Sequence, residues 1–126
     1  MSESSGAKDL YKQGMTLYGQ GKHPEAIECY RKALGLDPDW AEALQAMAMA
    51  QMHAGELDEA VANAERLVEL APEDPLAFTS LSMIYQRKDR IDDAEKAQAK
   101  ARMLSWKQEL KTNPDASPPD GMSVVQ

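Results

Sequence analysis

Residues 41–74 read AEALQAMAMAQMHAGELDEAVANAERLVELAPED, and segments of the same length on either side share their pattern. Residues 7–40 read AKDLYKQGMTLYGQGKHPEAIECYRKALGLDPDW, and residues 75–108 read PLAFTSLSMIYQRKDRIDDAEKAQAKARMLSWKQ. At this 34-residue interval the three copies carry similar residues, in the sets Leu10, Leu44 and Phe78; Gly14, Ala48 and Ser82; Ala26, Ala60 and Ala94; and Leu36, Leu70 and Leu104. A repeat of this length predicts supersecondary units that stack on their neighbours.

Each copy predicts two helices joined by a short turn. In the first copy Leu10, Gly14 and Leu17 recur at helical spacing. Gly21 follows them and supplies a left-handed residue at the end of the helix. Pro24 suits the first turn of the second helix, where its missing N–H would be unpaired. The sequence therefore predicts an all-α chain of helix–turn–helix repeats.

Aspartates before the second and third copies predict helix caps. Asp39 precedes the second copy, with Glu42 three residues later as its capping-box partner. Asp74 and Pro75 repeat this arrangement before the third copy.

The ends of the array predict further segments. Trp106 stands where Pro38 and Pro72 stop the earlier copies, so the last helix is expected to continue as a cap. Alternatively, Trp106 and Leu110 form an exposed patch for a second subunit. The expected organisation is a flexible N-terminus over 1–6, repeats over 7–40, 41–74 and 75–108, a helical extension over 105–112 and a disordered tail over 113–126.

Composition excludes several classes of protein. The 126 residues have a net charge of −7, which argues against a strongly basic nucleic-acid binder. No stretch approaches the roughly 20 apolar residues of a membrane span, and the N-terminus lacks a signal-peptide pattern. The single cysteine, Cys29, allows no internal disulfide and fits a cytoplasmic protein.

The repeats resemble the tetratricopeptide repeat family. The matching residues are Leu10, Gly14, Leu17, Ala26, Tyr30, Ala33 and Pro38 in the first copy, Leu44, Ala48, Ala60 and Pro72 in the second, and Phe78, Ser82, Tyr85, Ala94 and Ala101 in the third. The resemblance implies a right-handed superhelical solenoid whose first helices line a concave groove. It also implies a protein that binds peptide segments of other proteins there.

One face of the predicted first helices carries a methionine in each copy. Met15, Met49 and Met83 stand 34 residues apart, and methionine suits surfaces that fit varied apolar partners. The expected groove residues are Tyr11, Met15, Tyr18, Gln45, Met49, Met52, His53, Thr79, Met83 and Gln86. In the alternative interpretation, these methionines pack against neighbouring helices.

A known function of the family is not expected. Members that bind Hsp70 or Hsp90 hold a C-terminal carboxylate with lysine, asparagine and arginine. The matching residues here are Tyr11, Met15, Ala46, Leu76 and Ser80, and none can form a charge-assisted bond to a carboxylate.

Charge is distributed unevenly along the chain. Residues 37–75 hold ten acidic groups and one basic group, whereas residues 87–111 hold eight basic and five acidic groups. A partner with a basic patch, head-to-tail self-association and a merely solvated surface all fit this pattern.

No catalytic, cofactor or metal constellation is present in the sequence. Cys29 and His23 lack an orienting partner, and two scattered histidines do not make a metal site. The leading hypothesis is thus a non-catalytic adaptor that binds an apolar or amphipathic peptide of an unidentified protein, with no nucleic acid, membrane insertion, metal or cofactor. The alternatives are a self-assembling scaffold or homo-oligomer and a small chaperone for one client.

Overall fold

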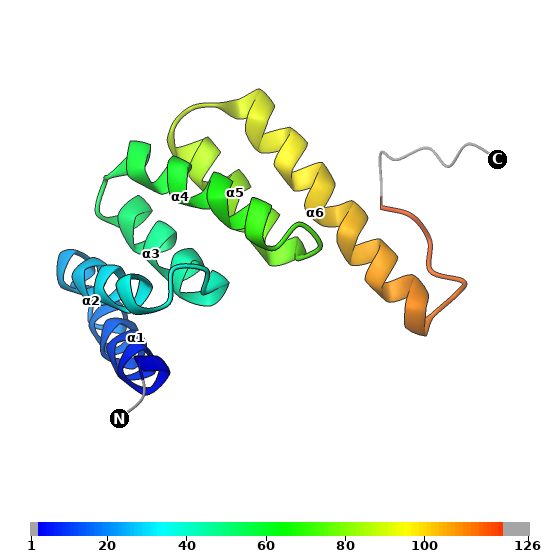
Figure 1. Ribbon diagram of the computed structural model, residues 1–126. Coiled ribbons are helices and arrows are strands. Elements are labelled where there is room, and N and C mark those ends of the chain that lie inside the picture. Colours follow the sequence, from blue (N-terminus) through cyan, green and yellow to red (C-terminus); the bar gives the residue numbers. More distant parts are fainter. Residues whose placement is uncertain (1–2, 120–126) are drawn as a thin grey trace.

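The computed structural model describes residues 3–119, and these residues form six helices without a strand. In chain order the helices are α1 (Glu3–Gly19), α2 (His23–Leu36), α3 (Ala41–His53), α4 (Leu57–Leu70), α5 (Pro75–Arg87) and α6 (Ile91–Thr112). Figure 1 shows consecutive helices running back and forth in pairs. The predicted all-α fold is confirmed.

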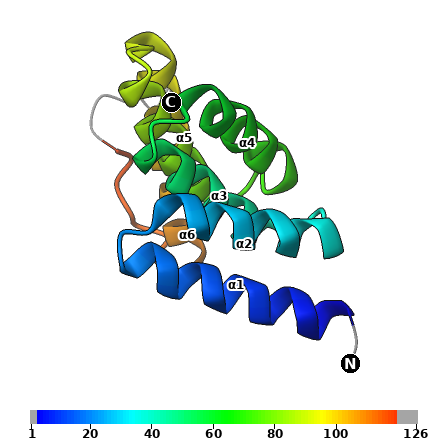
Figure 2. The ribbon, with the colours of Figure 1, turned by 90° about the vertical axis from the view of Figure 1, so that its left-hand side faces the viewer.

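The helix pairs stack into a solenoid. Each helix packs on the next in the chain, and α3 also contacts both α1 and α5. Figure 2 shows α1 and α2 side by side at one end of the array. The first helices of the three repeats, α1, α3 and α5, therefore adjoin one another, and we call the surface that they form the first-helix face.

The turns within the repeats share one backbone geometry. Gly21, Gly55 and Asp89 have φ angles of 78°, 83° and 64°. Each turn is closed by a backbone hydrogen bond, such as Lys22 N–H to the Leu17 carbonyl at 2.9 Å. The predicted left-handed residue at Gly21 is confirmed, and the same repeat position adopts this conformation in all three copies.

The two predicted aspartate caps have different outcomes. Asp74 caps α5, because its Oδ1 accepts a hydrogen bond from Leu76 N–H at 3.0 Å. The predicted cap by Asp39 is wrong: Trp40 occupies the N-cap position of α3, which leaves Asp39 one residue too early. Asp39 Oδ1 instead lies 3.4 Å from Nη2 of Arg66, which also donates to the Pro38 carbonyl at 2.7 Å.

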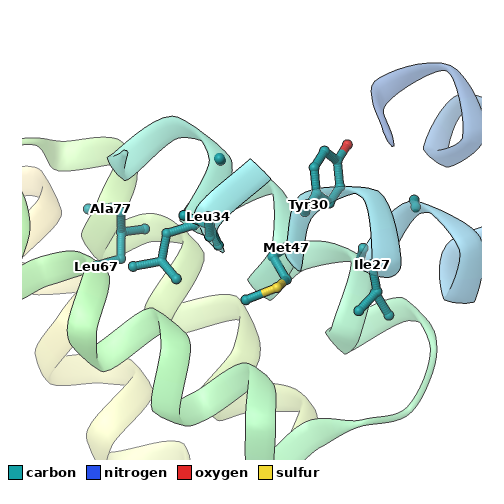
Figure 3. Packing of buried hydrophobic residues seen from close by; sticks show 10 residues of the cluster. Ile27, Tyr30, Leu34, Met47, Leu67 and Ala77 are labelled. Carbon is teal, nitrogen blue, oxygen red and sulfur yellow. The ribbon is translucent and has the colours of Figure 1, made fainter. Parts of the chain in front are cut away.

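Small residues allow the helices to approach closely. Eight alanines in four different helices are fully buried, namely Ala26, Ala33, Ala43, Ala48, Ala50, Ala60, Ala64 and Ala77. Larger side chains such as Tyr30, Met47 and Leu67 pack in one cluster with Ala26, Ala43, Ala50 and Ala77 (Figure 3). Because interiors are close-packed, a large side chain at these alanine positions would force the helices apart.

The ends of the array extend beyond the repeats. Helix α1 begins at Glu3, so residues 3–6, which were expected in a flexible N-terminus, are helical. Gly6 in this added turn lies near Leu36 of α2, because a Cβ at Gly6 would come within 3.6 Å of Leu36 Cδ1. Helix α6 continues to Thr112 and includes the predicted extension.

The chain turns back after α6. Nε1 of Trp106 donates a hydrogen bond to the Ala116 carbonyl at 3.0 Å, and Asn113 begins a short turn. The remainder of the predicted tail, 120–126, lies outside the described residues. Within the part of the chain that is described, no helix is long and apolar enough to cross a membrane.

Candidate protein-binding groove

A pocket with a volume of about 290 Å³ lies between α1 and α3 on the first-helix face. We call it the α1/α3 pocket. Its lining residues are Tyr11, Met15, Tyr18, Tyr30, Glu42, Gln45, Ala46, Met49 and Ser80. Five of the ten predicted groove residues, Tyr11, Met15, Tyr18, Gln45 and Met49, thus line one cavity.

Aromatic rings form much of the pocket wall. The ring of Tyr11 lies 5.8 Å from that of Tyr30 and 4.8 Å from that of Trp40, measured between centroids. Burial raises the pKa of Tyr30 to about 12 and also raises the pKa of Tyr11 and of Tyr18. The three phenols are therefore uncharged near neutral pH.

A polar link fixes the side of the pocket nearest α5. Nε2 of Gln45 donates to Oγ of Ser80 at 2.8 Å and lies 3.5 Å from the Leu76 carbonyl. Ser80 is buried, so the bond joins α3 to α5 within the packed structure. This bond holds the Gln45 side chain in place and leaves its carbonyl oxygen as an acceptor.

The predicted methionine face is only partly exposed. Met15 and Met83 have 48% and 41% of their surface exposed, whereas Met49 is half-buried. The predicted groove exposure of Met52 is wrong, because only 2% of its surface is exposed. Met52 belongs to the core cluster that contains Ile84 of α5, so it packs one repeat against the next.

The remaining predicted groove residues lie outside the α1/α3 pocket. Gln86 and His53 are exposed at the ends of α5 and α3. Thr79 lines a different pocket, between α5, α6 and the residues after α6. The structure therefore does not unite the ten residues in one cavity.

His53 belongs to a cluster of rings beside the pocket. Its ring stacks on that of His23 at a centroid distance of 5.2 Å, and Tyr18 meets both rings edge-on. Burial, followed by His23 and Arg87, lowers the pKa of His53. Because Tyr18 also lines the α1/α3 pocket, the cluster adjoins the candidate site.

The residues predicted for self-association lie near the end of α6. Trp106 and Leu110 are both half-buried. Trp106 lines the pocket that Thr79, Ser117 and Pro119 also border, and it contacts Ala116 through its indole N–H. The chain's own residues after α6 thus cover part of the surface that was expected to receive a second subunit.

Sequence reasoning missed Tyr30, Glu42, Ala46 and Ser80 as pocket residues. Tyr30 belongs to a second helix, and its ring reaches the first-helix face by passing α1 beside Gly14. Ala46 and Ser80 could have been predicted as pocket residues, because they match carboxylate-binding positions of the family. With Tyr11 and Met15, four of those five positions line this pocket, and the fifth, Leu76, is exposed.

The described residues offer few features of a metal site or of a reactive cysteine. Residues 3–119 contain no group of three or more histidine, cysteine or carboxylate side chains arranged for a metal ion. Cys29 is half-buried in α2. The pocket combines apolar and aromatic walls with few polar groups, which suits non-covalent binding.

The family model for the tetratricopeptide repeat matches residues 11–75 and 45–109. The chain belongs to the tetratricopeptide repeat family. Proteins of this family are generally non-catalytic modules that bind other proteins, and the helical solenoid found here has that architecture.

Among curated relatives, the chain is similar to photosystem I assembly protein Ycf3 of Synechococcus sp. strain CC9605. The two are 28% identical over 123 residues, covering 90% of this chain and 70% of that protein. The counterpart from strain WH7803 is also 28% identical over 88 residues, covering 68% of this chain. The chain spans only about half of that relative, 51% of its length.

Solved structures share the fold. The first tetratricopeptide repeat domain of Spaghetti (RPAP3), bound to the HSP90 peptide SRMEEVD, superposes with a TM-score of 0.74 at 22% identity. The match covers 89% of this chain and 82% of that one. At this identity the likeness concerns the fold alone.

Proposed function

We propose that this chain is a non-catalytic adaptor that binds an apolar or amphipathic segment of a partner protein on its first-helix face. The α1/α3 pocket carries the proposal, because it is open and lined by tyrosine and methionine side chains. Concave sites with mostly apolar walls and a few polar groups are the usual form of a ligand-binding site. Met83 and His53, which lie outside the pocket and are exposed, extend this surface along the array.

The stacking of the repeats forms this site in the free protein, before a partner binds. Gln45 is already held by Ser80, and the ring of Tyr30 is fully buried. The partner segment therefore bears most of the ordering cost on binding. Its apolar side chains gain affinity by leaving water, while the carbonyl of Gln45 accepts a hydrogen bond that sets register.

Met15→Glu is the sharpest test of this proposal. Met15 and Ile91 have the same exposed fraction, 48%, but Ile91 lies outside the pocket at the start of α6. Met49 suits this purpose less well, because it packs partly against the core. We expect a partner retained from native lysate by the wild type, and then purified, to lose about tenfold or more in affinity with Met15→Glu.

The matched control decides the interpretation. Ile91→Glu changes the charge equally and is expected to leave the affinity unchanged. Equal affinity of wild type and Met15→Glu would place the binding surface elsewhere. Equal losses with both variants would point to net charge and away from the pocket.

A chaperone for one client is the second candidate. The relative from strain CC9605 is named as an assembly protein and aligns with 90% of this chain. In that role the same face would hold a free subunit and release it on assembly. The retained partner would then be found as a free subunit and be absent from complexes of the mature assembly, whereas an adaptor would stay with the finished complex.

A further inference from the structure

The α1/α3 pocket contains a single charged side chain, the carboxylate of Glu42. Glu42 lies in the first turn of α3 and makes no ion pair within 4.0 Å among residues 3–119. Lys8 borders a neighbouring cavity with Glu42 but not this pocket. An anionic ligand would therefore meet repulsion here, and a cationic one would find an unpaired carboxylate.

The walls suit the rest of a long cationic side chain. Tyr11 and Tyr18 present partly exposed aromatic rings, and the faces of such rings attract ammonium and guanidinium groups. Met15 and Met49 supply flexible apolar surface for the methylene stem of lysine or arginine. The pocket thus offers separate places for the stem and for the charge.

A buried hydroxyl in the pocket wall lacks a partner. Tyr30 is fully buried, and its Oη has no hydrogen-bond partner among the described residues. Leaving such a group unpaired is unfavourable in a folded protein. Because Tyr30 Oη is not exposed, a ligand N–H reaches it only if the pocket wall shifts, whereas Gln45 Oε1 is an acceptor that needs no such shift.

The middle repeat, which supplies the α3 wall of the pocket, is acidic. Residues 37–75, which include all of α3 and α4, hold ten acidic groups and one basic group, Arg66. Arg66 is committed to Pro38 and Asp39 in the turn before α3. This excess of negative charge attracts basic segments and steers them toward the middle repeat.

We propose that the α1/α3 pocket accepts one lysine or arginine side chain of the partner, flanked in the partner by apolar residues. The inference rests on the proposed groove function and adds the side chain that the groove selects. Four positions that bind carboxylates in other members of the family line this pocket, whereas its charged residue, Glu42, lies outside that set.

The test selects peptides of about twelve residues from a random phage library on the full-length chain. Peptides that lose binding to Met15→Ala, which removes the apolar contact without adding charge to the pocket, are retained, synthesised and measured by calorimetry. We expect them to carry a basic residue at a fixed place between apolar residues. Replacing that residue by norleucine, which keeps the stem and removes the charge, is expected to weaken binding about three- to tenfold.

Variants of the chain then assign the effect to the pocket. Glu42→Gln should weaken the basic peptide about three- to tenfold and leave the norleucine peptide unchanged. Glu59→Gln, in the same acidic segment but outside the pocket, is the matched control and should change neither affinity appreciably. Tyr30→Phe should leave the free protein equally or more stable, because its unpartnered hydroxyl is gone.

The outcomes separate the two proposals. Pocket-dependent peptides without a basic residue would overturn this inference and leave the groove function intact. Equal losses with Glu42→Gln and Glu59→Gln would reduce the effect to long-range charge and also overturn it. If no selected peptide depends on Met15, the groove function itself fails.

Discussion

The ring of Tyr30 occupies the space that a side chain at Gly14 would need. A Cβ atom at position 14 would lie 2.5 Å from Cε1 and 2.8 Å from Cδ1 of Tyr30. Both residues are buried, and the ring forms part of the α1/α3 pocket. The absence of a side chain on α1 is thus what allows a residue of α2 to reach the first-helix face.

Gly14→Ala is expected to destabilise the protein although alanine favours helices. The clash with Tyr30 should cost about 1–3 kcal/mol, more than the roughly 1 kcal/mol gained in helix propensity. Gly35→Ala is the control, because a Cβ at Gly35 in α2 meets nothing within 4 Å. It should raise the free energy of unfolding by about 0.5–1 kcal/mol. Urea denaturation that gave both variants the same sign would contradict this account.

The buried amide of Gln51 should depend on its hydrogen bond from the half-buried Asn63. Gln51 has 1% of its surface exposed, and its Oε1 accepts a hydrogen bond from Nδ2 of Asn63 at 2.8 Å. Asn63→Ala leaves a buried polar group unpaired and is expected to cost about 1–3 kcal/mol.

The double variant Gln51→Leu with Asn63→Ala provides the comparison. It removes both polar groups and should be less destabilised than Asn63→Ala alone. Thermal denaturation of the wild type, both single variants and the double variant completes the cycle. Additive losses would mean that the two amides do not interact.

Periodicity was sufficient to predict the repeats but not the burial of each groove residue. Tyr18, Met52 and Gln86 share one repeat position, yet they are half-buried, buried and exposed. Met52 packs in the cluster with Ile84 of the following repeat, whereas no further repeat follows Gln86 among the described residues. Burial at this position depends on the neighbouring repeat, which a residue's own periodicity does not contain.

The pocket shows a second limit of the sequence pattern. Tyr11, Met15 and Tyr18 share one helical face and were predicted together. Tyr30 joins them from another helix, through the space left by Gly14. Contacts of this kind depend on how two helices pack, so spacing along one helix cannot reveal them.

Trp106→Phe should loosen the residues after α6. The substitution keeps an aromatic side chain but removes the indole N–H that donates to the Ala116 carbonyl at 3.0 Å. Backbone amides in 113–119 are expected to exchange faster with deuterated solvent, while those of α1 to α5 remain unchanged. Trp40→Phe is the control, since Trp40 packs on Tyr11 at the other end of the array. Equal exchange of 113–119 in Trp106→Phe and the wild type would show that this hydrogen bond does not hold the segment.

Acidification should destabilise the fold through His53. Burial, followed by the nearby His23 and Arg87, lowers the pKa of His53 below its ordinary 6.5. Above pH 6.5 His53 is neutral in both the folded and the unfolded protein, so its protonation costs no stability. As the pH falls from 6.5 toward the lowered pKa, His53 binds a proton in the unfolded chain before it does so in the folded protein. The free energy of unfolding therefore decreases over this range. The bond to Lys88 lowers the pKa of Asp58, so protonation of Asp58 also destabilises the fold, but only near its ordinary pKa of 3.8 and below. The urea concentration at the midpoint of unfolding should therefore change less with pH in His53→Gln than in the wild type, between about pH 5 and about pH 8. An equal slope in the two proteins would assign the pH dependence to groups other than His53.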